Sequence, residues 1–419
     1  MTQQTVDVAV IGGGAAGLAA AIEARRAGAP TVWILERSEA LGGVLPQCIH
    51  TGFGLHYFGE NLSGPEYIAR FIQKAQAVGV NWKLKTMALA VTPDRRIVAV
   101  NSEDGPLHLH PKAIVLAMGC RERPRGALRL PSTRPAGIFT AGTAQRLLDV
   151  EGYLPGKRVV LLGSGDVGLI VARRLTLEGV TVVAVLEIQP YPGGLRRNLV
   201  QCVEDFGTPL LLNHTITHIH GRDRVEGVTI AHVDGRQRPI PQTAKRLACD
   251  TLIVSAGLIP ENELSKDAGL LLDAHTGGPV VDEGMETSVN GVFACGNVVH
   301  VHDLVDHVTW SGEIAGRSAA RHAGDRKPES TRRIHVRAGA NVRYVVPQVI
   351  SGATPVTLFL RVKRPMRRVA VHIGDAITVT RRVVTPPELL VLTLPGGQRL
   401  PRDQLTVSVK RRENHADAS

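Results

Sequence analysis

Two glycine-rich stretches of the sequence share the spacing Gly-x-Gly-x-x-Gly, one over residues 12–17 and the other over 163–168. A glutamate, Glu36 or Glu187, follows the third glycine of each stretch by 19 positions. Glycines with this spacing allow a tight turn, a close approach of the backbone to a pyrophosphate, and close packing of a helix on a strand. The carboxylate then accepts hydrogen bonds from a ribose diol. Two copies with identical spacing predict two dinucleotide-binding sites in one chain.

The second stretch also carries information about which nucleotide it binds. A carboxylate at Glu187 repels a ribose 2′-phosphate, which favours NADH over NADPH. Arg196 and Arg197 follow closely and are suited to bind such a phosphate, so NADPH stays open as the less favoured nucleotide.

Apolar runs surround both stretches in the order that a doubly wound sheet requires: strand, glycine turn, helix, strand. The expected strands are residues 6–11, 31–35 and 113–119 in the first copy and 158–162, 180–186 and 251–257 in the second, with helices over 15–27 and up to Glu178. We therefore predict an α/β protein with two interleaved, doubly wound (Rossmann-like) dinucleotide-binding domains.

The last quarter of the chain differs in composition. Residues 326–419 hold 18 of the 49 Lys and Arg but only 6 of the 38 Asp and Glu, so the net charge of +11 arises there. Short β-type runs separated by Pro, Gly and Asp predict a small all-β domain. Its only aromatic residues are Tyr344 and Phe359, which argues against nucleic-acid binding. Its basic surface is either a docking surface for an acidic partner or an ordinary solvated face.

Other classes are disfavoured. The amino terminus lacks the basic segment of a signal peptide, and no charge-free apolar run reaches the ~18 residues that a membrane span needs. The five cysteines are odd in number and contain no C-x-x-C, which predicts a protein of the reducing cytoplasm without a disulfide framework or zinc site. Residues 300–307, HVHDLVDH, permit a metal site, but a polar lining of the cofactor pocket is favoured and no metal is predicted.

The chain resembles the pyridine nucleotide-disulfide oxidoreductase superfamily, flavoproteins with two dinucleotide-binding domains. The resemblance covers residues 5 to about 325 and is carried by both glycine-rich stretches, Gly42-Gly43, AMG at 117–119 and GVFACGN at 291–297. In that family the first stretch holds FAD and the second NAD(P)H. The last motif normally ends in an aspartate that binds the ribityl chain; here the residue is Asn297, which carries no charge.

The resemblance implies particular cofactor-binding residues. For FAD they are Gly12, Gly14, Ala16, Gly17, Glu36, Arg37, Gly42, Gly43, Ala117, Gly119, Gly296, Asn297 and Gly312. For NAD they are Gly163, Gly165, Asp166, Val167, Gly168, Glu187 and Gly257. Residues 311–316, SGEIAG, resemble the start of a helix whose N-terminus stabilises negative charge on the flavin.

The implied domain boundaries follow the motifs. The FAD-binding domain is discontinuous, over 1–125 and 250–325, with the NAD(P)H-binding domain inserted at 126–249. The basic β domain covers 331–412, and a polar tail covers 413–419.

A closer resemblance is to FAD-dependent oxidoreductases associated with a glycerol-3-phosphate dehydrogenase-like flavoprotein in anaerobic glycerol use. It is carried by stretches such as GGVLPQCIHTGFGLHYFGENLSGPEY, AMGCRERPRG and CGNVVHVHDLVDHV. More distantly, the chain is similar to subunits of opine oxidase and hydrogen cyanide synthase. The two glycine-rich stretches and the missing dithiol predict hydride transfer between NADH and FAD and electron transfer to or from a partner redox protein. The basic domain is the expected docking place of that partner. Homo- and hetero-oligomers both stay open.

Three residues are candidates for catalysis: Cys48, His50 and His302. A dithiol mechanism is disfavoured because Cys48 has no second cysteine close in sequence. Cys48 is expected to line or support the flavin site, while His50 has an ordinary pKa near neutrality and suits acid–base work. Two alternatives stay open: a thiol or peroxide reductase that uses Cys48 alone, and a non-catalytic flavin subunit of a heteromeric oxidase.

Overall fold

The computed structural model describes residues 3–326 and 332–412, and the chain divides into two compact units. The first unit comprises Met1–Pro46, Thr51–Cys120 and Pro260–Ser419, and the second comprises Gln47–His50 and Arg121–Ile259. The predicted polar tail at 413–419 lies outside the described residues.

A seven-stranded sheet forms the centre of the first unit. Its parallel part has the order β5-β2-β1-β8-β19, and β7 and β6 extend it beyond β8 as antiparallel strands. The bounds are β1 Gln3–Ile11, β2 Val32–Leu35, β5 Asn81–Lys83, β6 Thr86–Val91, β7 Ile97–Asn101, β8 Gly105–Leu116 and β19 Val292–Ala294. The middle strands are apolar and buried, as both faces of a covered parallel sheet require.

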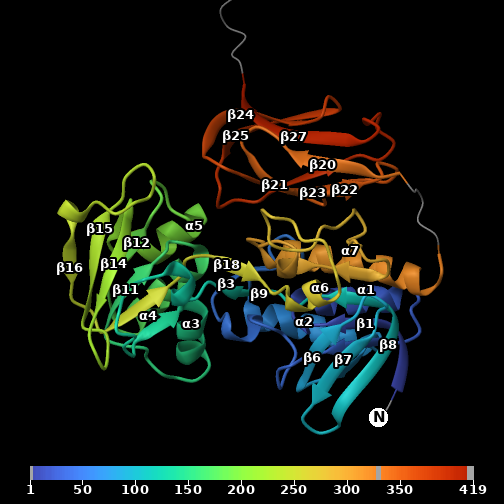
Figure 1. The fold of residues 1–419 in the computed structure, drawn as a ribbon, viewed down its shortest axis with the longest axis horizontal. Helices are drawn as coiled ribbons and strands as arrows, with labels where there is room; N and C mark the ends of the chain where they lie inside the picture. Colours follow the sequence, from blue (N-terminus) through green and yellow to red (C-terminus); the bar gives the residue numbers. More distant parts are fainter. Residues whose placement is uncertain (1–2, 327–331, 413–419) are drawn as a thin grey trace, which may run out of the picture. The chain divides into compact units, whose positions relative to one another are not determined.

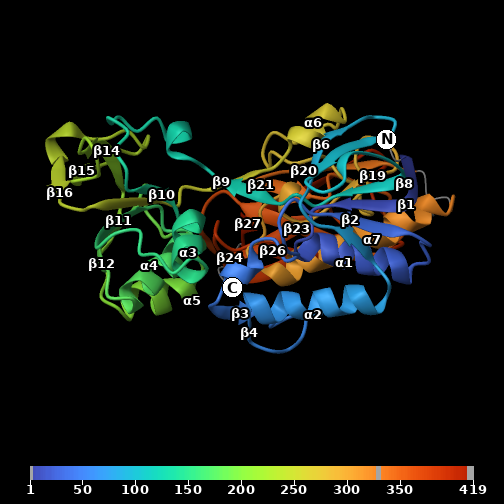
Figure 2. The same ribbon diagram turned by 90° about the horizontal axis from the view of Figure 1, so that it is seen from below.

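Helices α1 (Ala15–Arg26) and α7 (Val305–Ala323) lie side by side on this sheet (Figure 1). They approach closely because Gly312 and Gly316 of α7 face the backbone of Ala16 and Ala20 in α1. The other first-unit helices are α2 (Gly64–Ala77), which a Ser63–Glu66 capping box begins, and α6 (Glu263–Asp267). A hairpin of β3 (Thr51–Phe53) and β4 (Leu62–Ser63) precedes α2 (Figure 2).

The second unit repeats the parallel arrangement, with strand order β10-β17-β11-β12-β13. Its bounds are β10 Ile138–Thr140, β11 Arg158–Leu162, β12 Thr181–Glu187, β13 Leu210–Leu212 and β17 Thr251–Val254, with helices α3 Ala141–Asp149, α4 Asp166–Leu177 and α5 Arg196–Leu199. A three-stranded antiparallel sheet follows, formed by β14 His214–His220, β15 Gly227–His232 and β16 Lys245–Leu247. Short strands β9 (Cys120–Glu122) and β18 (Leu258–Pro260) pair with each other.

The carboxy-terminal part of the first unit is a β domain with its own apolar core. A five-stranded sheet has the order β22-β20-β27-β24-β25 and a three-stranded sheet the order β21-β23-β26. The bounds are β20 Ile334–Ala338, β21 Val342–Val346, β22 Val349–Ile350, β23 Val356–Val362, β24 Met366–Ile373, β25 Ile377–Val384, β26 Leu390–Leu394 and β27 Gln404–Arg411. The predicted fold class, α/β with a small all-β domain, is confirmed.

One expectation about secondary structure is wrong. The pattern at residues 311–316 predicts the start of a helix, but α7 begins at Val305, so these residues lie in its interior. The hydroxyl of Ser311 caps nothing: it donates to the carbonyl of Val308 and accepts from the N–H of Gly296. A serine followed by glycine resembles a helix start in sequence, but this serine serves a tertiary contact.

The contact between α1 and α7 yields a stability prediction. A Cβ at Gly312 would lie 2.3 Å from the carbonyl oxygen of Ala16, whereas one at Gly324, just past the same helix, would have its nearest neighbour at 3.5 Å. We expect Gly312→Ala to lower the free energy of unfolding by about 2 kcal/mol, because overpacking a tight contact outweighs the gain in helix propensity. Gly324→Ala should leave it nearly unchanged. Denaturant titration of both variants measures the difference, and equal stabilities would contradict the packing argument.

Candidate functional site: two dinucleotide cradles

The first cradle is the turn between β1 and α1. Gly12 has a φ of +105°, and a Cβ there would lie 2.5 Å from the carbonyl oxygen of Ala117, while a Cβ at Gly17 would lie 1.8 Å from that of Gly12. A Cβ at Gly14 would lie 3.8 Å from the Cα of Gly43, so there is space beside this glycine. Gly14 is the N-cap of α1 and offers no side-chain acceptor to the first turn, so its N–H groups are available to a phosphate.

Three other predicted segments meet this turn. Glu36, buried at the end of β2, accepts hydrogen bonds from the N–H groups of Gly13 (2.7 Å) and Ser38 (2.8 Å). The N–H of Gly42 donates to the carbonyl of Gly13 over 2.9 Å, which holds the Gly42-Gly43 turn on the loop. Ala117 donates its N–H to the carbonyl of Ile11. By contrast, the side chain of Arg37 is exposed, and Gly119, with a φ of +74°, has open space around it.

The motif around Gly296 reaches the same cradle from the far end of the chain. A Cβ at Gly296 would lie 2.7 Å from the Cβ of Ala16, and one at Gly312 would meet the backbone of Ala16. Asn297 follows, and its side-chain oxygen accepts from the backbone N–H of His302 over 3.0 Å. Five other parts of the chain thus surround this glycine turn: Glu36, Gly42-Gly43, Ala117, Gly296-Asn297 and Gly312. The free N–H groups of the turn suit a pyrophosphate and the carboxylate of Glu36 suits a ribose, so the cradle fits FAD.

The second cradle, between β11 and α4, has the same construction. Gly163 has a φ of +104°, and a Cβ there would lie 2.1 Å from the carbonyl oxygen of Ser255; Gly165 is an N-cap without a side-chain acceptor. Glu187, buried at the end of β12, accepts from the N–H (3.1 Å) and hydroxyl (2.5 Å) of Ser164. This cradle fits NAD(P)H.

The remaining predicted residues of the second cradle hold its loops. Asp166 accepts from the N–H of Leu195 (2.8 Å) and the amide of Asn198 (2.7 Å). Val167 packs against the core, a Cβ at Gly168 would lie 2.8 Å from Ser255, and Gly257 has a φ of +100° with open space around it.

Sequence reasoning missed one feature of the second cradle. Gly193 donates its N–H to the hydroxyl of Ser164 over 2.7 Å, so the Gly193-Gly194 turn covers this loop as Gly42-Gly43 covers the first. A signal existed: Gly193 lies 30 positions past Gly163, just as Gly42 lies 30 positions past Gly12. Aligning the two copies beyond their glutamates would have found it.

Residues 300–307, which we call the histidine segment, contain an unusual concentration of unsatisfied buried polar atoms. Seven buried side-chain nitrogen or oxygen atoms in the described residues have no hydrogen-bond partner, and five of them belong to this segment, on His300, His302, Asp306 and His307. Each such atom costs about 1–3 kcal/mol unless something satisfies it.

The imidazoles of this segment are neutral at physiological pH. Burial lowers the pKa of His300 to about 3 and that of His307 to about 4. Burial, together with the neighbouring His300, holds the pKa of His302 well below its usual value. These rings therefore act as hydrogen-bonding groups and not as cations. The described residues contain no group of three or more His, Cys, Asp or Glu suited to a metal ion.

A model of the pyridine nucleotide-disulphide oxidoreductase family matches residues 6–326. The chain belongs to this family. Members of this family are NAD(P)H-dependent flavin oxidoreductases that use FAD and NAD(P)H. Where the structure describes the chain, no helix is long and apolar enough to cross a membrane.

Individual relatives are distant. The chain is 26% identical to one of the opine oxidase subunits of Agrobacterium tumefaciens (strain Ach5), over 75% of this chain and 64% of that protein. It is 27% identical to an NAD(P)H sulfur oxidoreductase (CoA-dependent) of Pyrococcus abyssi, over 72% and 65% respectively. The thioredoxin reductase of T. acidophilum superposes with a TM-score of 0.62 at 25% identity, over 75% of this chain and 98% of that one. The chain thus spans just under two thirds of these two curated relatives.

The three catalytic candidates fall into different units. Cys48 and His50 belong to the second unit, where the charge of Asp149 influences Cys48 and that of His50 influences Asp149. His302 belongs to the first unit, beside Asn297. All five cysteines lie within the described residues, and none forms a disulfide.

Cys48 is poorly suited to nucleophilic chemistry. Burial and, to a smaller extent, the negative charge of Asp149 raise the pKa of its thiol to about 12, although a hydrogen bond with Gln145 opposes them in part. A redox-active thiol in proteins normally has a pKa lowered by positive charge or a helix N-terminus.

This environment predicts slow alkylation of Cys48. At pH 8 a thiol with a pKa of about 12 should react with iodoacetamide more than about a thousandfold more slowly than one with an ordinary pKa, because only the thiolate attacks. Mass spectrometry of the Cys48 peptide measures the rate, with the protein unfolded in guanidinium chloride as the control. Equal rates in the folded and unfolded protein would show that the thiol is activated or open to solvent.

Proposed function

We propose that this protein transfers a hydride between NADH and FAD and passes electrons to or from a partner redox protein. The observation that carries the proposal is the pair of cradles with matching construction, each with its own buried glutamate. FAD, when bound at the first cradle, accepts or donates the hydride. The protein contributes two glycine turns and the first-turn N–H groups of α1 and α4, which bind pyrophosphate, and the carboxylates of Glu36 and Glu187, which bind ribose.

The preference for NADH rests on Glu187. Its carboxylate is buried and held by the N–H groups of Ser164 and Gln189 and the hydroxyl of Ser164, so it cannot turn away to make room for a 2′-phosphate. Arg196, one of the two cations in the neighbourhood, pairs with Glu204 over 2.5 Å. Both contacts support NADH as the preferred nucleotide.

An anaerobic titration tests the function. NADH should bleach the visible flavin band of the purified protein at near-stoichiometric amounts, with NADPH less effective. Glu187→Gln, which keeps the size of the side chain and removes its charge, should reduce the preference for NADH by about tenfold, since specificity is a difference between two affinities. Glu178→Gln, at the exposed end of α4, is the control. A yellow protein that neither nucleotide reduces would overturn the proposal.

Two observations bear on the partner. The opine oxidase relative is named as a subunit, and so is the HcnB protein of hydrogen cyanide synthase in Pseudomonas protegens, which is 26% identical over 75% of this chain and 68% of that protein. These names support a heteromeric assembly. A glycerol-3-phosphate dehydrogenase-like flavoprotein is the partner that the sequence resemblance implies. The same names are also compatible with the alternative of a non-catalytic flavin subunit. The raised pKa of Cys48 weighs against the other alternative, a thiol or peroxide reductase.

The cysteines bear on the cellular compartment. Five thiols without a disulfide fit a reducing, cytoplasmic setting.

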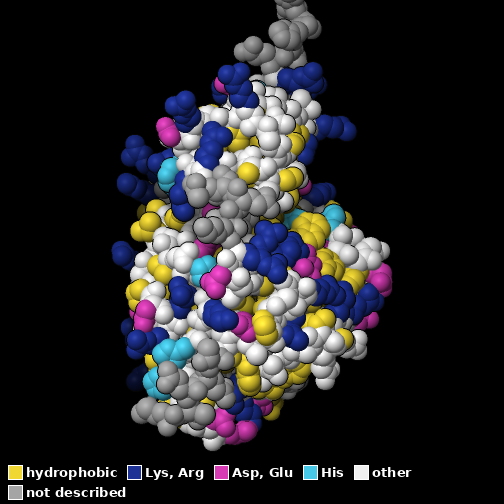
Figure 3. All heavy atoms as spheres, turned by 90° about the vertical axis from the view of Figure 1, so that its right-hand side faces the viewer, with side chains coloured by type: hydrophobic (Ala, Val, Ile, Leu, Met, Phe, Trp, Pro, Cys, Tyr) yellow, Lys and Arg dark blue, Asp and Glu magenta, His cyan; other side chains and the backbone are white. Residues whose placement is uncertain are grey.

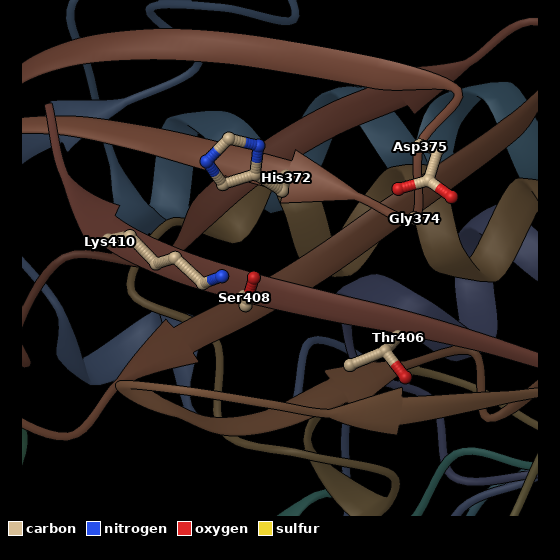
Figure 4. Close-up of a pocket in the computed structure, with 6 residues that line it drawn as sticks. All are labelled: His372, Gly374, Asp375, Thr406, Ser408 and Lys410. Atoms are coloured by element: carbon tan, nitrogen blue, oxygen red, sulfur yellow. The ribbon is translucent and has the colours of Figure 1, made fainter. Parts of the chain in front are cut away.

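The β domain offers a surface for such a partner. Residues 332–412 contain 16 Lys and Arg and three acidic residues, and Lys and Arg side chains are prominent over this domain (Figure 3). The outer face of its larger sheet contains a hollow of about 240 Å³ lined by His372, Gly374, Asp375, Thr406, Ser408 and Lys410. In Figure 4 the ammonium of Lys410 points toward the hydroxyl of Ser408. Arg337 lies in register with Thr406 beside it. Such a face suits an acidic protein surface.

Charge reversal tests this docking surface. With an acidic ferredoxin as the probe, we expect binding to weaken with salt, and Arg337→Glu plus Lys410→Glu to weaken it by about tenfold more. Arg343→Glu plus Arg364→Glu makes the same charge change on the strands and turn of the other sheet. Calorimetry measures both pairs at two salt concentrations. Equal losses in the two would mean that only net charge matters and that this face is no docking site.

A further inference from the structure

The histidine segment has a second set of neighbours, from the β domain. Arg361 of β23 reaches it from the domain's smaller sheet, which lies next to α7 (Figure 1). One terminal nitrogen of its guanidinium donates to Asp303 (2.5 Å) and to the carbonyl of Val301 (3.2 Å). The side chains of Arg361 and Asp303 are each only 12% exposed. The ion pair is therefore a buried connection between the β domain and the loop after the second FAD motif.

The rest of the guanidinium is held within the β domain. Its other terminal nitrogen donates to the carbonyls of Pro386 and Pro387, both at 2.7 Å, and Nε donates to the hydroxyl of Tyr344 at 3.1 Å. The second oxygen of Asp303 accepts from the N–H of Leu389 at 2.6 Å. Every part of this pair is engaged, so the β domain holds the loop at two points, the backbone carbonyl of Val301 and the side-chain carboxylate of Asp303.

Strand β23 adds an aromatic contact to this anchor. Phe359 lies two positions before Arg361, on the same side of the strand. Its ring centroid lies 5.5 Å from those of both His300 and His302 and 6.1 Å from that of His307. The β domain thus contacts the three imidazoles directly, in addition to holding their backbone.

The orientation of His302 follows from its hydrogen bonds. The side-chain oxygen of Asn297 accepts from the backbone N–H of His302 and lies 3.2 Å from its Nδ1. Since that oxygen can only accept, Nδ1 carries the ring proton and Nε2 of the neutral ring has a free lone pair. This Nε2 is buried and has no hydrogen-bond partner among the described residues. Since Nε2 is enclosed by protein, the hydrogen bond of Nδ1 to Asn297 is the link between His302 and the first cradle, because Asn297 is only half-buried and directly follows Gly296.

We propose that the β domain is a working part of the flavin site, in which Arg361 positions the histidine segment so that His302 holds the side chain of Asn297 for contact with bound FAD. Arg361 and His302 act as positioning residues, and Asn297 is the cofactor contact. The inference rests on the proposed FAD site at the first cradle. It gives a role to a domain that begins beyond the region matched by the family, which ends at residue 326.

The test measures FAD affinity without any nucleotide. FAD is removed from the protein and added back, and the dissociation constant is read from flavin fluorescence. His302→Phe should weaken FAD binding by about tenfold, the effect of one lost hydrogen bond, and Arg361→Met should weaken it at least as much. His335→Phe and Arg364→Met, which change an exposed histidine and an exposed arginine of the same domain, should leave the dissociation constant unchanged.

The double variant separates positioning from general stability. If Arg361 acts through His302, then His302→Phe with Arg361→Met should bind FAD no more weakly than the weaker single variant, because the second change removes nothing further. The visible absorption of bound FAD should also shift in both single variants, which loss of stability alone does not produce. Asp303→Asn, which removes the charge and keeps the shape, replaces Arg361→Met if that variant does not fold.

Three results would overturn the inference: unchanged FAD affinity in His302→Phe, a lower melting temperature without weaker FAD binding in Arg361→Met, or additive losses in the double variant. Failure of the unaltered protein to bind FAD at all would instead overturn the proposed function.

Discussion

The close approach of α1 to the strand ends of the first unit is the contact on which the rest of that unit depends. A side chain at Gly17 would collide with the carbonyl of Gly12, and one at Gly12 with that of Ala117, so the turn closes only with glycine at both positions. On its other side α1 accepts α7 equally closely, at Gly312 and Gly316. Because α7 directly follows the Gly296 motif and the histidine segment, this packing brings the two ends of a discontinuous domain to one turn.

The two cradles have the same electrostatic arrangement for binding an anionic dinucleotide. Each helix begins at a glycine without a side-chain cap, which leaves N–H groups and the positive end of the helix dipole available to an anion. Each also holds a glutamate whose carboxylate is buried against the turn by backbone N–H groups. The carboxylate is thereby oriented before any ligand arrives, so little of the binding energy is lost in ordering it.

The β domain adds a different kind of interaction. A buried ion pair such as Arg361–Asp303 contributes little net stability compared with a well-packed apolar pair, but breaking it leaves an uncompensated charge in the interior. The guanidinium of Arg361 donates hydrogen bonds to five groups: the carbonyls of Val301, Pro386 and Pro387, the carboxylate of Asp303 and the hydroxyl of Tyr344. Together these bonds fix the orientation of the Arg361 side chain. The histidine segment, to which the loop of Val301 and Asp303 belongs, contains five of the seven unsatisfied buried polar atoms of the described residues. Stability and site geometry are thus coupled at this junction.

The sequence by itself determined the fold class, both cradles and most of their elements, because glycine spacing and apolar periodicity are local. The strand predicted over 158–162 is β11, and the β-type runs predicted in the last quarter of the chain form the strands of the β domain. Only the tertiary structure decided where α7 begins, because Ser311 and Gly312 are used for contacts with Gly296 and Ala16, which no local pattern reveals. It alone also brought Arg361 to the histidine segment and surrounded Cys48 with groups that suppress its ionisation. These are long-range contacts, which depend on how complete elements pack and not on the residues next to them in the chain.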